Sequence, residues 1–219
     1  MKLKDLEKDY DRLQLIYGDP SLHSIYNGGY DENPNICFVF MNPTGRNIAS
    51  LPGWDGPYHP WLGTKNIWDL FIQVGLIDET IYKEIKSIKG SEWDKDFCLK
   101  VYDDVTKHKI FITNLGKCTQ VDARPLTDNY FTDYLPLLEK EISIIKPKVI
   151  VLFGNQVSSI FLDKKISVSQ TRKQCFEKEI DGEVYKCFSV FYPVGNGRFN
   201  IDKAIEDINW IQENYVKEK

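Results

Sequence analysis

Six consecutive apolar residues, Ile36 to Met41, constrain the fold of this chain more than any other stretch. A run of this length without polar alternation predicts a strand that is covered on both faces, which is typical of parallel sheets between layers of helices. The run ends at Asn42-Pro43. Proline cannot donate to a sheet ladder, and Gly45 permits a tight turn, so the chain is expected to leave the sheet there. In open α/β sheets, ligands bind at this end of the strands.

Two further apolar runs, 109–115 and 149–153, predict strands of the same kind, with helical spacing between them. Strands and helices that alternate in this order indicate a parallel sheet covered on both sides. Asp181-Gly182 separates two β-rich runs and predicts a hairpin. We therefore predict an α/β fold, a three-layer α/β/α sandwich with a small, mainly parallel central sheet, formed by residues 1–219 as a single domain.

Apolar residues recur at three- and four-residue spacing in the segments that we expect to be helical. These segments are 3–17, 66–74, stretches between 76 and 105, 127–145, 155–162 and 202–216. Thr127-Asp128 is expected to cap the helix that Pro147 ends. The Gly- and Asn-rich segment 18–35 is expected to be a loop.

Composition excludes several classes of protein. No apolar run approaches the roughly 20 residues needed to span a bilayer, and the charged segment 1–13 does not resemble a signal peptide. We expect a cytoplasmic protein without membrane contact. The five cysteines include no CxxC pair, which argues against a disulfide framework and a closed zinc site. The net charge of −4 gives no global attraction to nucleic acid, so such contact would need a local basic face.

Two motifs near the first strand resemble the uracil-DNA glycosylase superfamily. FMNPTG resembles its first motif, a Gly-x-Asn-Pro or Gly-x-Asp-Pro turn after the first strand, with Phe40 in place of the glycine. PYHPWLGTKNIW resembles the aromatic loop of the mismatch-specific glycosylases, in which an aromatic residue lies five positions before an asparagine. This match places Trp61 at the base-stacking position. The resemblance extends from about residue 36 to 212 and implies the fold predicted above.

The stretch FITNLGKCTQVDARPLT is similar to the iron–sulfur glycosylases of thermophiles, in which an Asn-x-x-Lys-Cys turn precedes a long helix. By this match Asn114 reads the edge of the pyrimidine. Cys118 fits one ligand position of the cluster, but Tyr134 stands at the next one and the amino-terminal CxxC pair is absent. We therefore expect no iron–sulfur cluster, no metal and no other cofactor.

The third loop, 192–200, departs from the family pattern. The family usually has His-Pro-Ser or Asn-Pro-Ser, and this chain has Tyr192-Pro193-Val194. The three histidines, His23, His59 and His108, lie elsewhere in the sequence. The resemblance implies a DNA glycosylase that acts on uracil or a related deaminated base in DNA, as a monomer. Two alternatives stay open: a nucleic-acid or nucleotide binding module without the chemistry, and a glycosylase for hypoxanthine or mismatched thymine.

Cleavage of an N-glycosidic bond requires a flipped base that leaves as an anion, and a positioned water. Trp61 offers a stacking face, and a carboxamide at position 114 can donate to a carbonyl oxygen and accept from ring N3–H. Asn42 is expected to orient the water, and backbone N–H groups from Met41 to Gly45 are expected to hold base oxygens. The residues expected to act in catalysis are Asn42, Tyr192 and Asn196, and those expected to bind the base are Met41, Pro43, Thr44, Trp61 and Asn114. The residues expected to contact DNA are Arg46, Lys65, Lys117, Arg124, Arg198 and Phe199, of which Arg198 or Phe199 would fill the gap left by the flipped nucleotide.

Each of these residues, taken singly, also has an ordinary structural interpretation: a turn, a packed aromatic ring, a strand cap or a solvated charge. The functional interpretation depends on their coincidence. It predicts that carboxamides 42 and 114, the indole at 61 and the backbone before Phe199 converge on one cavity sized for a single pyrimidine.

Overall fold

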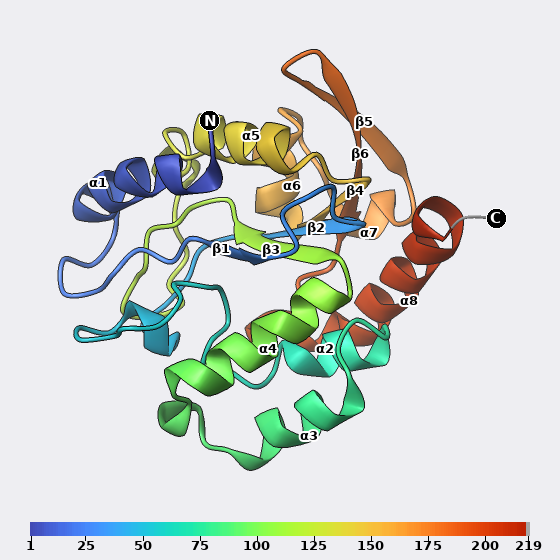
Figure 1. Ribbon diagram of the computed structural model, residues 1–219. Helices are drawn as coiled ribbons and strands as arrows, with labels where there is room; N and C mark the ends of the chain where they lie inside the picture. The colour runs from blue at the N-terminus through green and yellow to red at the C-terminus, as the bar shows by residue number, and fades with distance from the viewer. Residues whose placement is uncertain (218–219) are drawn as a thin grey trace.

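Six strands form one mixed sheet in the computed structural model, which describes residues 1–217 (Figure 1). The strand order is β1–β3–β2–β4–β6–β5. The four inner strands are parallel: β2 (Ile36–Phe40), β3 (Ile110–Asn114), β4 (Val149–Phe153) and β6 (Glu183–Val190). The edge strands β1 (Asn27–Gly29) and β5 (Cys175–Ile180) are antiparallel to their neighbours.

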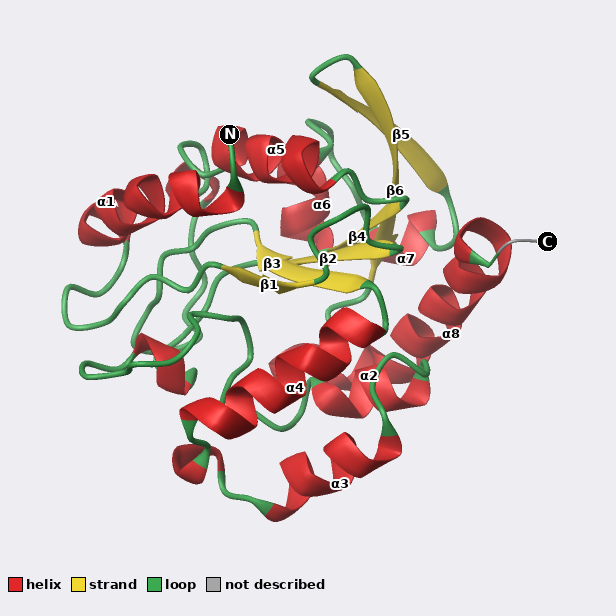
Figure 2. Ribbon diagram, viewed as in Figure 1, coloured by secondary structure: helices red, strands yellow, loops and turns green. Residues whose placement is uncertain are grey.

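Helices cover both faces of the sheet (Figure 2). One layer holds α1 (Glu7–Tyr17), α5 (Leu135–Ile145) and α6 (Asn155–Phe161). The opposite layer holds α2 (Trp68–Gln73), α3 (Glu79–Ser87), α4 (Lys95–Lys107) and α8 (Ile201–Ile211). The short α7 (Val168–Thr171) precedes the hairpin β5–β6.

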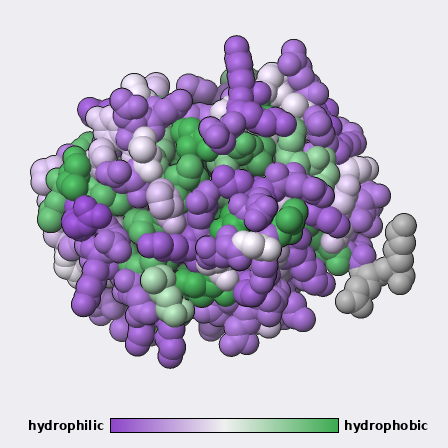
Figure 3. All heavy atoms as spheres, turned by 90° about the horizontal axis from the view of Figure 1, so that it is seen from above, coloured by the Kyte–Doolittle hydropathy of each residue, from purple (hydrophilic) through white to green (hydrophobic). Residues whose placement is uncertain are grey.

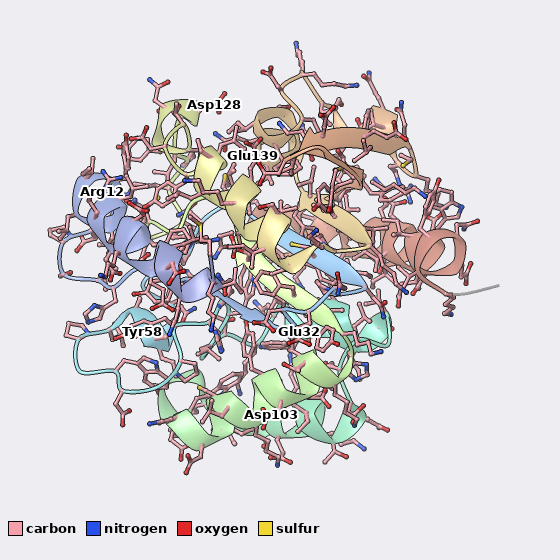
Figure 4. The ribbon with its side chains drawn as sticks, turned by 45° about the horizontal axis from the view of Figure 1, so that its top comes forward. Arg12, Glu32, Tyr58, Asp103, Asp128 and Glu139 are labelled. Atoms are coloured by element: carbon pink, nitrogen blue, oxygen red, sulfur yellow. The ribbon has the colours of Figure 1, made fainter. Side chains whose placement is uncertain are left out.

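Alternation along the strands divides the core between the two layers. Phe38 and Phe40 of β2 pack with α2, α3, α4 and α8, whereas Cys37 and Val39 pack with α1, α5 and α6. All five residues of β2 are buried, because successive side chains of a strand point to opposite faces and both faces are covered. In Figure 4, Glu139 on α5 and Asp103 on α4 lie in the two opposite outer layers. The predicted α/β/α sandwich with a mainly parallel sheet is confirmed.

Two sequence predictions of local structure differ from the structure. The segment expected to be a loop contains β1, whose Gly28 packs so closely that a Cβ there would lie 2.4 Å from a ring carbon of Tyr102. The helix expected from Thr127 begins at Leu135 instead. Pro136 explains this start, because proline is tolerated in the first turn of a helix and not in its interior.

Other predictions of local structure are confirmed. Asp181 and Gly182 have φ values of 50° and 78°, and positive φ at both central residues is what a type I′ hairpin turn requires. Lys146, with φ of 51°, ends α5 directly before Pro147. The last predicted helix comprises α8 and a following π-helical turn, Gln212–Val216.

The helical connections that follow β2, β3 and β4 leave room for a ligand at the carboxyl end of β2. The helices that follow β2 pack on one face of the sheet, whereas α5 after β3 and α6 after β4 pack on the other. Neighbouring strands whose connections leave toward opposite faces form a topological switch point, where ligands bind at the carboxyl ends of the strands.

No helix within residues 1–217 combines the length and the apolar character needed to cross a membrane. Figure 3 shows the face above α1 and α5, where hydrophilic side chains cover most of the surface and hydrophobic patches lie between them.

Candidate active site

A cavity of about 790 Å³ opens at the carboxyl ends of β2, β3 and β6. Its wall combines the turn after β2, the aromatic loop 60–67, the end of β3 and the loop 194–197 after β6. The predicted site residues in this wall are Met41, Asn42, Pro43, Thr44, Arg46, Trp61, Lys65, Asn114, Arg124, Tyr192 and Asn196. The predicted convergence is therefore present. The cavity is larger than a single pyrimidine needs, because its volume falls in the range of sites for drug-sized ligands, roughly 300–1,000 Å³.

Asn114 is the last residue of β3, and hydrogen bonds hold its backbone. It pairs with Phe40 in the sheet, and its carbonyl oxygen accepts a hydrogen bond of 2.8 Å from Lys117 Nζ. The side chain is 2 % exposed, and its Nδ2 has no hydrogen-bond partner among residues 1–217. An unpaired buried donor costs about 1–3 kcal/mol. A ligand with an acceptor oxygen in the cavity would satisfy this amide.

Trp61 adopts a backbone conformation that is unusual for a bulky residue, with φ of 65°. Thr64 holds it there, because its N–H and its Oγ1 both donate to the Trp61 carbonyl oxygen, at 3.2 and 2.7 Å. The indole packs edge-on against Phe40 with 4.9 Å between ring centroids. Phe40, which replaces the family glycine, therefore supports the indole from the core side. Strained backbone of this kind clusters at functional sites, and no sequence motif indicated the strain.

His59 holds the start of the aromatic loop against β1. Its Nδ1 lies 2.5 Å from the Asn27 carbonyl oxygen, and its ring lies 4.3 Å from the ring of Tyr102. The Tyr102 hydroxyl donates to the Pro60 carbonyl oxygen at 2.7 Å. Burial lowers the pKa of His59 from its ordinary value of 6.5 to about 4, so the neutral imidazole donates from Nδ1 at neutral pH.

This lowered pKa predicts a pH-dependent stability. The unfolded chain binds more protons than the folded one between about pH 6.5 and pH 4, so the free energy of unfolding should fall as the pH drops through this window, by up to about 3 kcal/mol. His59→Gln replaces the imidazole with a carboxamide that can also donate to the Asn27 carbonyl oxygen but does not titrate. The free energy of unfolding of this variant should change less over the same window. Urea unfolding of both proteins at several pH values across the window measures the difference. If the free energy of unfolding falls equally steeply with pH in both proteins, His59 is not the group responsible.

Asn42 follows β2 and Tyr192 follows β6, and both line the cavity. The Asn42 Nδ2 donates to the Pro43 carbonyl oxygen at 3.0 Å, which leaves Oδ1 as the end of the side chain that can accept from water. Burial raises the pKa of the Tyr192 hydroxyl above its ordinary value of 10, so this group is a proton-bearing donor at neutral pH. The Gly45 N–H donates to the Gln120 carbonyl at 2.7 Å. Contrary to expectation, this N–H is not free for a base oxygen.

The basic residues at the cavity differ in their partners. Arg124 Nε donates to Asp122 at 2.7 Å, and Lys65 Nζ donates to the Lys86 carbonyl oxygen at 2.9 Å. Arg198 and Phe199 lie outside the cavity wall, on the turn Gly195–Asn200 whose first residues line it. Arg198 lies 3.3 Å from Asp69, and Phe199 is 96 % exposed. Phe199 therefore presents an exposed apolar ring on the turn that borders the cavity.

Lys117 does not lie on this surface, and its prediction as a DNA contact is wrong. The side chain is 1 % exposed, and its ammonium lies 2.8 Å from Glu141, whose side chain is fully buried on α5. Burial lowers the pKa of Lys117, and Glu141 opposes this shift. The prediction failed because the polar loop after β3 turns inward, where the Lys117 ammonium pairs with the buried carboxylate of Glu141.

The donors around Cys118 do not suit an iron–sulfur cluster. Cys118 is buried beside the side chain of Tyr134, the residue that the sequence match places at the next ligand position. In residues 1–217 the one group of three potential metal ligands with atoms close together is Asp78, Asp104 and His108, which joins α3 to α4. In that group Asp104 accepts from the Asp78 backbone N–H at 2.8 Å, so its carboxylate has a structural role.

A family model of the uracil DNA glycosylase superfamily matches residues 29–205. The chain belongs to this superfamily. The match includes all six strands except the first two residues of β1, as well as the whole cavity wall. The resemblance inferred from the sequence motifs is thereby confirmed, and membership in the uracil DNA glycosylase superfamily supports DNA binding and a glycosylase-like function in general.

Proposed function

We propose that this protein is a DNA glycosylase that hydrolyses the N-glycosidic bond of uracil, or of a related deaminated base, after the nucleotide is flipped out of DNA. We further propose that residues 1–219 act as a single domain. The buried Nδ2 of Asn114, which lies in the cavity wall and has no hydrogen-bond partner within residues 1–217, is the observation that carries the proposal. Uracil offers a carbonyl oxygen and an N3–H at one edge, which match the donor and the acceptor of a carboxamide. Cytosine lacks the N3 hydrogen and would leave the amide mismatched.

The proposed mechanism assigns each wall residue a task that its geometry supports. The flipped base stacks on the indole of Trp61, and Asn114 binds its polar edge. As the bond breaks, negative charge grows on the base oxygens. Hydrogen bonds from Asn114 and Tyr192 stabilise this charge most strongly where water is excluded. Asn42 Oδ1 accepts from the attacking water and orients it, since a carboxamide cannot act as a strong base. Asn196, Met41, Pro43 and Thr44 complete the wall around the base and sugar.

The DNA backbone is proposed to follow the rim of the cavity. Arg46, Lys65 and Arg124 line it and can neutralise phosphates locally, despite the acidic total charge. Phe199 is proposed to enter the base stack where the flipped nucleotide leaves a gap, as apolar wedges of architectural proteins do. Its 96 % exposure fits such insertion, because an apolar side chain in water gains free energy when it is covered.

Two alternatives are each favoured by one observation. The three histidines are absent from the described cavity wall, so the donor that the family takes from histidine must come from Tyr192 or its neighbours. This favours a nucleic-acid binding module with weak chemistry. The cavity volume of about 790 Å³ would also admit a purine, which favours hypoxanthine as a substrate.

An abasic-site assay separates these functions. Labelled oligonucleotides, single- and double-stranded, would each contain one uracil, hypoxanthine, mismatched thymine or cytosine, and alkali would cleave any abasic site that forms. We expect abasic sites at uracil and none at cytosine. Binding of uracil-containing DNA without abasic sites would support the binding module. Abasic sites confined to hypoxanthine or mismatched thymine would reassign the substrate.

A further inference from the structure

A buried charged network lies directly behind Asn114. The ammonium of Lys117 has three hydrogen-bond acceptors: the Asn114 carbonyl oxygen and Glu141 Oε2, each at 2.8 Å, and the Thr113 hydroxyl. Thr113 Oγ1 in turn donates to Glu141 Oε1 at 2.9 Å. Three donors on the ammonium thus meet three acceptors, and the network is closed.

Burial of this pair has no evident benefit for stability alone. Lys117 is 1 % exposed, and Glu141 and Thr113 are fully buried. Removal of two charges from water is costly, and well-packed apolar residues of similar volume often stabilise a fold as well or better. A buried ion pair is more readily explained where it fixes one specific geometry, and the geometry fixed here is that of Asn114.

Further hydrogen bonds tie the turn that carries Lys117 to two neighbouring segments, the segment before β1 and the end of β2. The Lys117 carbonyl oxygen accepts from Ile25 N–H and from the Ser24 hydroxyl. The turn 114–118 is also bonded to the end of β2, because Leu115 N–H and Gly116 N–H donate to the carbonyls of Phe40 and Met41. The backbone that carries Asn114 is thereby fixed relative to the turn that carries Asn42.

We infer that Lys117, Glu141 and Thr113 are positioning residues that hold the carboxamide of Asn114 in the orientation needed to bind the flipped base. The inference rests on the proposed function, in which Asn114 contacts that base. The network touches Asn114 through its backbone carbonyl, and misplacement of a binding group by about 1 Å can slow a reaction roughly 100-fold.

The test is a double-mutant cycle with Asn114. In Lys117→Met/Glu141→Gln both charges are removed together, which avoids a buried charge without a partner. We expect the rate of uracil release at saturating DNA to fall between about 10- and 100-fold, with little change in KM because phosphate contacts dominate DNA affinity. When Asn114→Ala is added, the pair variant should cause no further loss, because the network acts through that side chain.

Arg172→Met/Asp207→Asn is the matched control. Arg172 also forms an ion pair with a buried carboxylate, since its Nη2 lies 2.9 Å from Asp207 Oδ1. Asp207 is 1 % exposed, and neither residue lines the cavity. Any effect of this control on uracil release should multiply with that of Asn114→Ala. If the Lys117/Glu141 effect multiplies in the same way, the positioning role is overturned.

Two further measurements keep the inference falsifiable if the pair variant folds poorly or the proposed function fails. Thr113→Val removes one hydroxyl from the network and should slow release, whereas Thr113→Ser keeps the hydroxyl and should restore it. The side-chain amide NMR signals of Asn114, assigned by their loss in Asn114→Ala, should shift or broaden in Thr113→Val and stay unchanged in the Arg172/Asp207 control. Unchanged signals in Thr113→Val would refute the positioning role. A wild-type protein that releases no uracil would refute the proposed function and leave the NMR result to decide the positioning.

Discussion

Replacement of Asn114 by alanine should lower the rate of uracil release by about 10²–10³-fold, the loss typical of one donor to a developing oxyanion. The expected loss is this large because the carboxamide is 2 % exposed and water cannot replace it at the same geometry. Stability should hold or rise, since the substitution removes a buried Nδ2 that has no partner among the described residues. Single-turnover rates with uracil-containing duplex and thermal unfolding midpoints measure the two effects.

Two further variants test whether the expected loss is specific to the carboxamide of Asn114. Asn114→Asp keeps the size of the side chain but places a carboxylate against the departing base anion, so its rate should be lower than that of Asn114→Ala. Asn155→Ala removes a carboxamide on α6 that accepts from the Val168 N–H of α7, outside the cavity wall, and its rate should match the parent. If Asn114→Ala releases uracil at the parental rate, the assignment of Asn114 to base recognition is wrong.

Replacement of Trp61 by alanine should lower kcat/KM for uracil release by about 5- to 150-fold, which corresponds to the roughly 1–3 kcal/mol of one base–aromatic stack. The indole has a firm support for this role, because Phe40 packs against it at 4.9 Å and Thr64 fixes its backbone. Trp61→Phe keeps a ring at the same place and should retain most of the activity. Steady-state kinetics with one oligonucleotide measures all three proteins.

Trp54→Ala is the control for the loss of an indole from the same connection between β2 and α2. Trp54 is half-buried, its Nε1 donates to the Pro57 carbonyl at 2.9 Å, and it does not line the cavity. Its removal should leave kcat/KM within a few-fold of the parent. An equal loss in Trp54→Ala and Trp61→Ala would mean that the connection between β2 and α2 matters as a whole and that no base stacks on Trp61.

The strands of the sheet were predictable because the sequence pattern that produces each of them lies within a few consecutive residues. A strand buried on both faces needs an unbroken apolar run, and the runs at 36–41, 109–115 and 149–153 contain β2, β3 and β4. The turn Asp181-Gly182 was predictable for the same reason, since positive φ at two successive residues favours these residue types. The edge strand β1 was not predictable, because its three residues form a strand through pairing with β3 and have no apolar pattern of their own.

The location of the cavity was predictable from the strand ends and the family motifs, because parallel strands bring their carboxyl ends to one edge of the sheet. The surroundings of individual side chains were not. The sequence near Lys117 gives no indication that its ammonium faces Glu141, 24 positions further along the chain, nor that Trp61 adopts a left-handed backbone conformation. Hydrophobic periodicity records which residues leave water, and so the sequence by itself determined the layers and the edge at which the loops meet. Partners of buried charges and strained turns depend on distances between remote segments, and only the tertiary structure decided that the basic residue after β3 turns inward to support Asn114 instead of outward to meet DNA.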